Sequence, residues 1–185
     1  SIVGEKRIPS ANTTPESYRV QELFHEMVEA GLDAVVMEVS SQALMLHRVS
    51  GFTFDIGVFT NLEPDHIGEN EHKDFADYMH CKSLLFRQCK LGIFNGDSEH
   101  LEGILKGHTC EVETFGYGKN NDLVADGVEL KKDHGALGVR YHVSGLMSFD
   151  VEVNVPGSFS VYNSLTAIAI CHHFGVDVEK IKHAL

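Results

Sequence analysis

The sequence lacks the long apolar run of a membrane-spanning helix, and it lacks the basic leader and apolar segment of a signal peptide. Positive charge is also scarce. Fifteen Lys and Arg stand against 27 Asp and Glu, so the formal net charge is -12 at pH 7. This balance excludes a domain that grips nucleic acid through its phosphate backbone by charge alone. We therefore expect no membrane or nucleic-acid partner, and a monomer that acts in the cytoplasm.

Two kinds of cysteine or glycine motif are missing as well. The four cysteines, Cys81, Cys89, Cys110 and Cys171, show neither CxxC nor zinc-finger spacing, which favours free thiols in a reducing compartment. No GxxxxGK[ST] phosphate-binding loop occurs. The first residue is Ser rather than Met, and we expect a fragment or a processed product.

The residues that are present predict one α/β domain over 1–185. Hydrophobic residues make up 43% of the 185, enough for one sizeable core. Short β-branched apolar runs alternate with helical patterns, which indicates a mostly parallel sheet flanked by helices. The predicted strands are Asp33–Val39, Ile56–Thr60, Leu91–Phe94 and Glu111–Phe115, and the predicted helices start near Thr14, Lys73, Val161 and Val178.

The pattern changes near residue 120. Between 120 and 156, runs of alternating residues are separated by turn residues, which is typical of antiparallel strands. We interpret this part as a small antiparallel β annex within the same domain.

Lys82 is the first candidate for chemistry. In the helix that holds DFADYMHCKSLLF, it shares a face with Phe75, Tyr78 and Phe86 at helical spacing. Burial lowers a lysine pKa, and a neutral amine can react with carbon dioxide to form an anionic carbamate that holds a metal ion. Alternatively, the lysine stem lies along the apolar stripe while its amine reaches water.

Glu38 and His66 each follow a predicted buried strand. Ligands of open α/β sheets bind at the carboxyl ends of the strands, so these two residues and Lys82 would converge on one sheet edge. A carboxylate there suits a hard cation such as Mg²⁺. Alternatively, Glu38 is a solvated loop carboxylate, and His66 is one of 12 histidines without a special role.

Other candidates would hold anions or polar groups. Arg48 lies in a loop and could bind a carboxylate or phosphate through two nitrogens. Asn12, Thr13 and Thr14 offer polar groups near a helix N-terminus, where anions are favoured, and they could equally cap the helix. Asn163 follows a Pro-Gly turn, and it too could be a cap.

Several strings in this order resemble the Mur ligase family. The match covers nearly the whole chain, and the first two strings are similar to its UDP-N-acetylmuramoyl-tripeptide synthetase branch. The strings are NTTPES (12–17), MEVSSQAL (37–44), HRV (47–49), TNLEPDHIGENEH (60–72), YMHCKSLLF (78–86), FNGD (94–97) and GSFSVYNSLTAIA (157–169).

The resemblance implies the P-loop NTPase-like central domain of an ATP-dependent amide ligase of peptidoglycan synthesis. Such enzymes add a third amino acid, L-lysine or meso-diaminopimelate, to UDP-N-acetylmuramoyl-L-alanyl-D-glutamate through an acyl phosphate. It implies that the magnesium-site residues are Glu38, His66 and a carbamylated Lys82, and that nucleotide is bound by Asn163 and Asp97. By the same resemblance, the UDP-sugar peptide would be held by Asn12, Thr13, Thr14, Ser40 and Arg48.

The missing phosphate-binding loop bears on activity. In the family it lies upstream of NTTPE, so we expect a domain truncated at its N-terminus that does not turn over alone. Two alternatives stay open: a non-catalytic module that binds UDP-muramoyl peptide, and a sister amide ligase such as a polyglutamate or cyanophycin synthetase.

Overall fold

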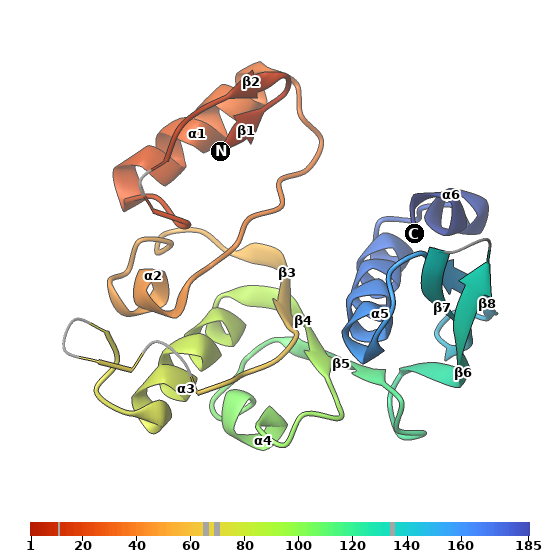
Figure 1. Cartoon of the computed structure of the whole chain (residues 1–185). Helices are drawn as coiled ribbons and strands as arrows, with labels where there is room; N and C mark the ends of the chain where they lie inside the picture. The colour runs from red at the N-terminus through yellow and green to blue at the C-terminus, as the bar shows by residue number, and fades with distance from the viewer. Residues whose placement is uncertain (11, 65–66, 69–70, 134–135) are drawn as a thin grey trace.

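The computed structural model describes residues 1–10, 12–64, 67–68, 71–133 and 136–185. Its elements in chain order are β1 (Ile2–Val3), β2 (Lys6–Arg7), α1 (Ser17–Glu29), α2 (Ser41–Met45), β3 (Phe54–Phe59), α3 (Phe75–Ser83), the 3₁₀ turn η1 (Leu84–Arg87), β4 (Cys89–Asn95), α4 (Leu101–Ile104), β5 (Glu111–Gly116), β6 (Leu123–Asp133), β7 (Ala136–Gly145), β8 (Phe149–Val153), α5 (Ser158–His173) and α6 (Val178–Ala184). Figure 1 shows these elements along the chain.

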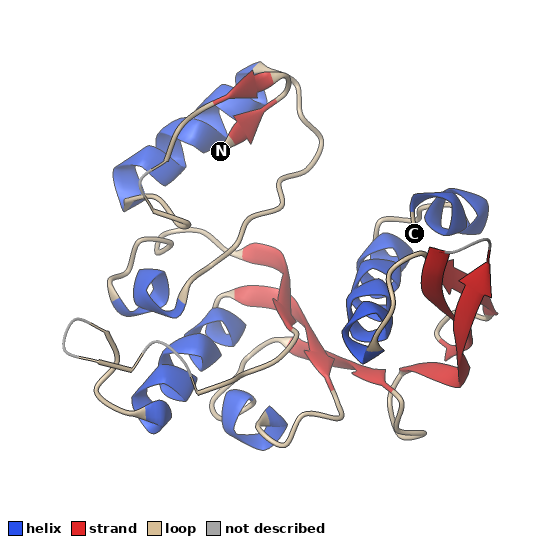
Figure 2. Cartoon of the chain, viewed as in Figure 1, coloured by secondary structure: helices blue, strands red, loops and turns tan. Residues whose placement is uncertain are grey.

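A single six-stranded sheet runs through the molecule in the order β3-β4-β5-β6-β7-β8. The pairs from β3 to β6 are parallel, and β6–β7 and β7–β8 are antiparallel. The expected fold class, a mostly parallel sheet with an antiparallel β part, is therefore confirmed. The antiparallel strands extend the main sheet through β6 (Figure 2). A separate two-stranded sheet, β1-β2, lies near the N-terminus.

Helices cover both faces of the sheet. Ile93 and Phe94 are neighbours on β4 and both are fully buried, but they belong to different core clusters because successive strand residues point to opposite faces. Ile93 packs with α5 residues such as Leu165, and Phe94 packs with Tyr78 of α3 and Ile104 of α4. Figure 1 shows α3 and α4 on one side of β3–β5 and α5 on the other.

The predicted strand Asp33–Val39 is wrong. The segment has no strand structure, and Val36 is 95% exposed. A strand forms only where a neighbour satisfies its N–H and C=O groups, and none of the described strands pairs with this segment. Despite its β-branched composition, the segment is therefore a loop that leads into α2.

Two helix starts also differ from expectation. The residue before α1 is Glu16, whose side chain makes no capping hydrogen bond, and the expected hydroxyl cap is absent. Asn163 lies inside α5, which begins at Ser158, so it is no cap. Within the described residues, every helix is too short or too polar to cross a membrane.

Candidate functional site

Thr14 brings together two segments that are distant in sequence. Its hydroxyl donates a hydrogen bond to the Glu38 carbonyl at 2.9 Å and accepts one from the Ser40 N–H at 3.0 Å. Thr14 is only 1% exposed, and both hydrogen bonds are part-buried. The hydroxyl that could have capped α1 instead fixes the loop before α2, and with it the backbone of Glu38 and Ser40.

Arg48 is held against the same segment. Its guanidinium forms an ion pair with Glu16 at 2.8 Å and donates to the Thr14 carbonyl at 3.4 Å. The side chain is 14% exposed, and its Nε atom is buried without a hydrogen-bond partner among the described residues. The planar donors of a guanidinium suit carboxylate and phosphate groups.

Asn12 and Thr13 lie at the exposed end of this group. Both side chains are exposed, and the Asn12 carbonyl accepts a hydrogen bond from the Ser10 hydroxyl at 2.6 Å. Thr13 and Glu38 both line a hollow of about 190 Å³ that also borders α1. The structure thus places the Asn12–Thr14 turn, the loop of Glu38 and Ser40, and Arg48 side by side.

Lys82 lies near the end of α3 and is half-buried. Burial lowers its pKa, and the charge of Glu38 acts in the opposite direction. The ammonium lies 5.7 Å from the centre of the Tyr78 ring. Lys82 therefore lies partly among apolar groups and within electrostatic reach of Glu38. His66, the third predicted metal ligand, falls outside the described residues.

A second site lies at the carboxyl ends of β3 and β4. Asp97 and Asn163, both expected to bind nucleotide, line one hollow of about 430 Å³. Asn95, at the end of β4, and Thr60, just after β3, also face it. This is the sheet edge at which open α/β folds bind ligands.

Asp97 makes four hydrogen bonds beside this hollow. Its carboxylate accepts hydrogen bonds from the backbone N–H groups of Tyr117 and Gly118 (2.5 and 3.0 Å), from Asn121 Nδ2 (3.0 Å) and from the Tyr162 hydroxyl (3.1 Å). Burial alone would raise the pKa of Asp97, but these donors hold it below its usual value. Burial and the Asp97 charge raise the pKa of Tyr162 to about 12.

Sequence reasoning missed the residues that surround Asp97. Tyr162 directly precedes Asn163 on α5, so its bond to Asp97 ties the start of that helix to the end of β4. The position of Tyr162 directly before Asn163, a predicted nucleotide-binding residue, was the signal that could have indicated it. Tyr117 and Asn121 gave no signal, because only the folded chain brings their loop to Asp97.

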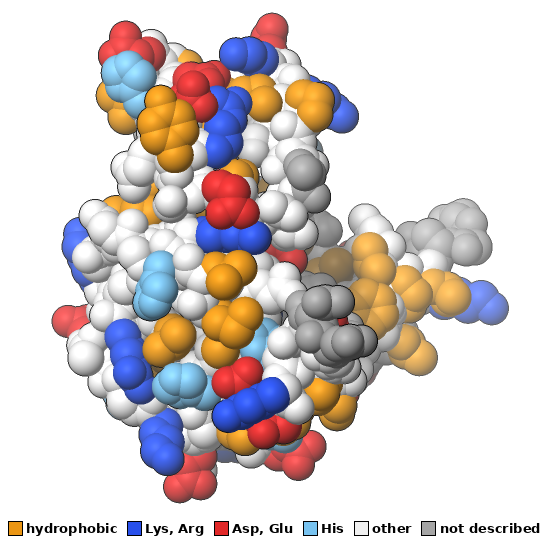
Figure 3. Space-filling model, turned by 90° about the vertical axis from the view of Figure 1, so that its left-hand side faces the viewer, with side chains coloured by type: hydrophobic (Ala, Val, Ile, Leu, Met, Phe, Trp, Pro, Cys, Tyr) orange, Lys and Arg blue, Asp and Glu red, His pale blue; other side chains and the backbone are white. Residues whose placement is uncertain are grey.

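Charges of both signs are mixed on one face of the molecule. On the face that Figure 3 shows, Lys and Arg side chains are scattered among acidic ones. One example on α1 is Arg19, which pairs with Glu22 and with Glu26.

Comparisons with known proteins identify the family of the chain. Residues 1–171 match the model of the Mur ligase middle domain. The chain is 38% identical over 185 residues to UDP-N-acetylmuramoyl-L-alanyl-D-glutamate–2,6-diaminopimelate ligase 1 of Clostridium acetobutylicum, covering 100% of this chain and 37% of that protein. It is 35% identical over 185 residues to UDP-N-acetylmuramoyl-L-alanyl-D-glutamate–L-lysine ligase of Streptococcus pneumoniae, again covering 100% and 37%.

The fold comparison agrees with this match at the level of the fold. A solved structure of a UDP-N-acetylmuramoyl-L-alanyl-D-glutamate–2,6-diaminopimelate ligase superposes with a TM-score of 0.77 and 22% identity, covering 91% of this chain and 35% of the other. The chain thus spans little more than a third of the length of the relatives it matches. The chain belongs to the Mur ligase family, as a Mur ligase middle domain.

Proposed function

We propose that the chain is the nucleotide-handling part of an ATP-dependent amide ligase of bacterial peptidoglycan synthesis. The ligase adds L-lysine or meso-diaminopimelate to UDP-N-acetylmuramoyl-L-alanyl-D-glutamate in the cytoplasm, and so serves cell shape and cell division. The observation that carries the proposal is the meeting of three distant motifs at Thr14, whose hydroxyl and carbonyl contact Glu38, Ser40 and Arg48. The named relatives that match the whole chain support the substrate.

In this proposal the Thr14 cluster holds the UDP-sugar peptide. Arg48 binds an anionic group of the substrate, because the ion pair with Glu16 fixes its guanidinium, whose planar donors suit carboxylates and phosphates. Asn12 and Thr13 supply polar groups at the exposed edge, and Ser40 adds a hydroxyl. The Ser40 hydroxyl already caps α2 by accepting from the Ala43 N–H at 3.1 Å, so it would act on the substrate as a donor.

Mg²⁺ would be held by Glu38, His66 and Lys82 in its carbamylated form. The described residues fit this role: burial lowers the pKa of Lys82 and so favours the neutral amine, which attacks carbon dioxide to form the carbamate and releases a proton. The Glu38 charge opposes that shift, and its carboxylate is a ligand type that suits Mg²⁺. When bound, Mg²⁺ neutralises the charge of a phosphoryl group during its transfer.

ATP would lie in the hollow that Asp97 and Asn163 line. The volume of this hollow, about 430 Å³, is in the range of small-molecule sites. Because four donors already occupy the Asp97 carboxylate, its role is to position Tyr162 and Asn163 at the start of α5. The Asn163 side chain, which also faces the hollow, is left to contact the nucleotide.

The first test is calorimetric titration of UDP-N-acetylmuramoyl-L-alanyl-D-glutamate into the chain. We expect binding that weakens in Arg48→Ala and is unchanged in Arg87→Ala, a control at an exposed arginine of η1. Equal binding by Arg48→Ala, with circular dichroism showing a folded protein, would remove Arg48 from the site.

A second test concerns turnover. We expect the 185-residue chain to form no amide from ATP, dipeptide substrate and amino acid, and the complete ligase to form it. Amide formation by the pure chain would contradict the expectation that the chain lacks groups that hold the phosphates.

A further inference from the structure

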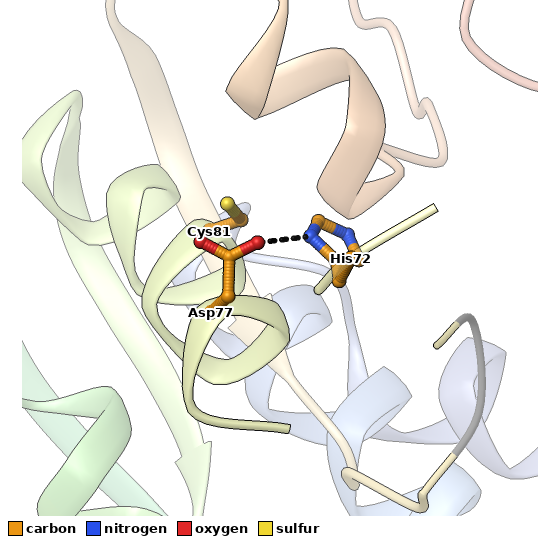
Figure 4. A group of neighbouring side chains, drawn as sticks. All are labelled: His72, Asp77 and Cys81. Atoms are coloured by element: carbon orange, nitrogen blue, oxygen red, sulfur yellow. Dashed lines mark hydrogen bonds and ion pairs between the residues drawn. The ribbon is translucent and has the colours of Figure 1, made fainter. Parts of the chain in front are cut away.

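Three side chains of different chemistry gather between α3 and the loop before it, and none has a role in the site described above. They are His72, Asp77 and Cys81, and one potential ligand atom from each lies within 4.8 Å of the others. Asp77 and Cys81 are four residues apart, so they share one face of α3. Figure 4 shows the Asp77 carboxylate turned toward the His72 imidazole, with Nδ1 3.3 Å from Oδ2.

The imidazole of His72 is fixed before any ligand arrives. His72 is 0% exposed, and its Nε2 lies 2.8 Å from the Ser41 hydroxyl oxygen. Its ring also packs against Tyr78, with centroids 5.2 Å apart. A histidine that binds a metal through one nitrogen commonly uses the other in such a hydrogen bond, which sets the tautomer and the ring orientation.

We propose that His72 Nδ1, an Asp77 carboxylate oxygen and Cys81 Sγ form a site for a thiophilic divalent cation of the Zn²⁺ type. Nitrogen, sulfur and carboxylate oxygen are the ligands that Zn²⁺ uses, whereas Mg²⁺ prefers oxygen alone. Water fills the fourth position. On binding, Cys81 releases its thiol proton to solvent, and bonds to the cation replace the contact between His72 and Asp77.

Charge and access both favour this assignment. A dication, the Asp77 carboxylate and the Cys81 thiolate sum to zero, which suits a site whose histidine and cysteine are 0% and 3% exposed. The Asp77 side chain is 26% exposed and gives the ion a route from solvent. The Cys81 sulfur lies within 4.8 Å of the other two ligand atoms. The site does not depend on the proposed ligase function, because Glu38 and Lys82 take no part in it.

Titration of the chain with Co²⁺ under reducing conditions tests the proposal, because a cobalt–thiolate bond adds a charge-transfer band in the near ultraviolet. We expect this band in the wild type, its displacement by Zn²⁺, and its loss in Cys81→Ser. Asp77→Asn keeps the shape of the side chain but not its charge, and should weaken Co²⁺ binding about tenfold or more. Cys171→Ser removes a thiol outside the cluster and should leave the band intact.

Three results would overturn the proposal. The first is the absence of a thiolate band in a wild-type chain that circular dichroism shows to be folded. The second is a band that survives Cys81→Ser, because the thiolate would then come from another cysteine. The third is an unchanged affinity in Asp77→Asn, which would assign the cation to other residues even if it binds.

Discussion

The Thr14 hydroxyl accepts a hydrogen bond from the Ser40 backbone N–H at 3.0 Å, although 26 residues separate the two. The same hydroxyl donates to the Glu38 carbonyl, so one buried side chain bonds to the loop on both sides of Val39. Thr14 thus sets where Glu38 and Ser40 stand relative to the turn before α1.

Thr14→Val tests this attachment, because valine has nearly the same shape but cannot form either hydrogen bond. We expect the free energy of unfolding to fall by about 1–2 kcal/mol, since the part-buried Ser40 N–H loses its partner. Substrate affinity should fall as well. Chemical denaturation and calorimetric titration measure the two effects. Thr14→Ser keeps the hydroxyl and should retain most of the stability and most of the substrate affinity. Equal losses in Thr14→Val and Thr14→Ser would contradict the role of the hydroxyl.

Lys82→Arg tests the proposed carbamate, because a guanidinium stays charged and does not react with carbon dioxide. We expect the complete ligase to lose nearly all activity in this variant. Mass spectrometry of the native protein in bicarbonate should show the gain of one carbon dioxide in the wild type and not in the variant. Lys90→Arg is the control, because Lys90 is exposed and paired with Asp55 at 2.6 Å. A mass gain that persists in Lys82→Arg would refute the assignment.

Asp97 predicts a dependence of stability on pH. Its pKa is lower in the folded protein than in the unfolded chain, so the stabilisation is complete above the unfolded value and is lost as the pH falls through the folded one. Asp97→Asn should therefore lower the free energy of unfolding near neutral pH by about 1–2 kcal/mol, a figure that allows for the partial solvent exposure of Asp97. The loss should be smaller near pH ~3, where the wild-type carboxylate begins to be protonated.

Urea denaturation at several pH values measures this difference. Glu99→Gln is the control, because Glu99 is an exposed carboxylate beside the same hollow and should show little effect. A loss in Asp97→Asn that does not shrink at acid pH would mean that its shape, and not its charge, matters.

Glu113 and His173 join β5 to the end of α5. His173 Nε2 lies 2.6 Å from Glu113 Oε2, and the Glu113 side chain is 9% exposed. His173→Ala leaves that buried carboxylate without its partner and should cost about 2–4 kcal/mol of stability. The double variant His173→Ala with Glu113→Leu should recover part of this loss. Thermal unfolding of His173→Ala, Glu113→Leu and the double variant measures the three losses of stability. A double-variant loss equal to the sum of the two single losses would contradict the coupling.

Some elements follow from local sequence because local composition and tertiary context agree. Leu91–Phe94 and Glu111–Phe115 are strands as expected, since each has a neighbouring strand on both sides. Asp33–Val39 has an equally apolar composition but pairs with no described strand, and it stays a loop. Composition shows that a segment can form a strand, but the available partners decide whether it does.

The candidate site divides in the same way. Residue types and motif order were enough to select Arg48, Glu38, Lys82, Asp97 and Asn163, because charged and amide groups in those contexts carry recognisable chemistry. The structure brings Glu38 within electrostatic reach of Lys82, and Asp97 and Asn163 to one hollow. It does not test the metal site as a whole, because His66 lies outside the described residues.

The sequence by itself determined the family, the α/β class and the identity of most candidate ligands, because these depend on residue type, order and periodicity. Only the tertiary structure decided that the Thr14 hydroxyl holds a distant loop and that four donors occupy the Asp97 carboxylate. It also decided that His72 meets Asp77 and Cys81. The physical reason is that hydrogen bonds and burial join residues far apart in the chain, and no local pattern specifies those partners.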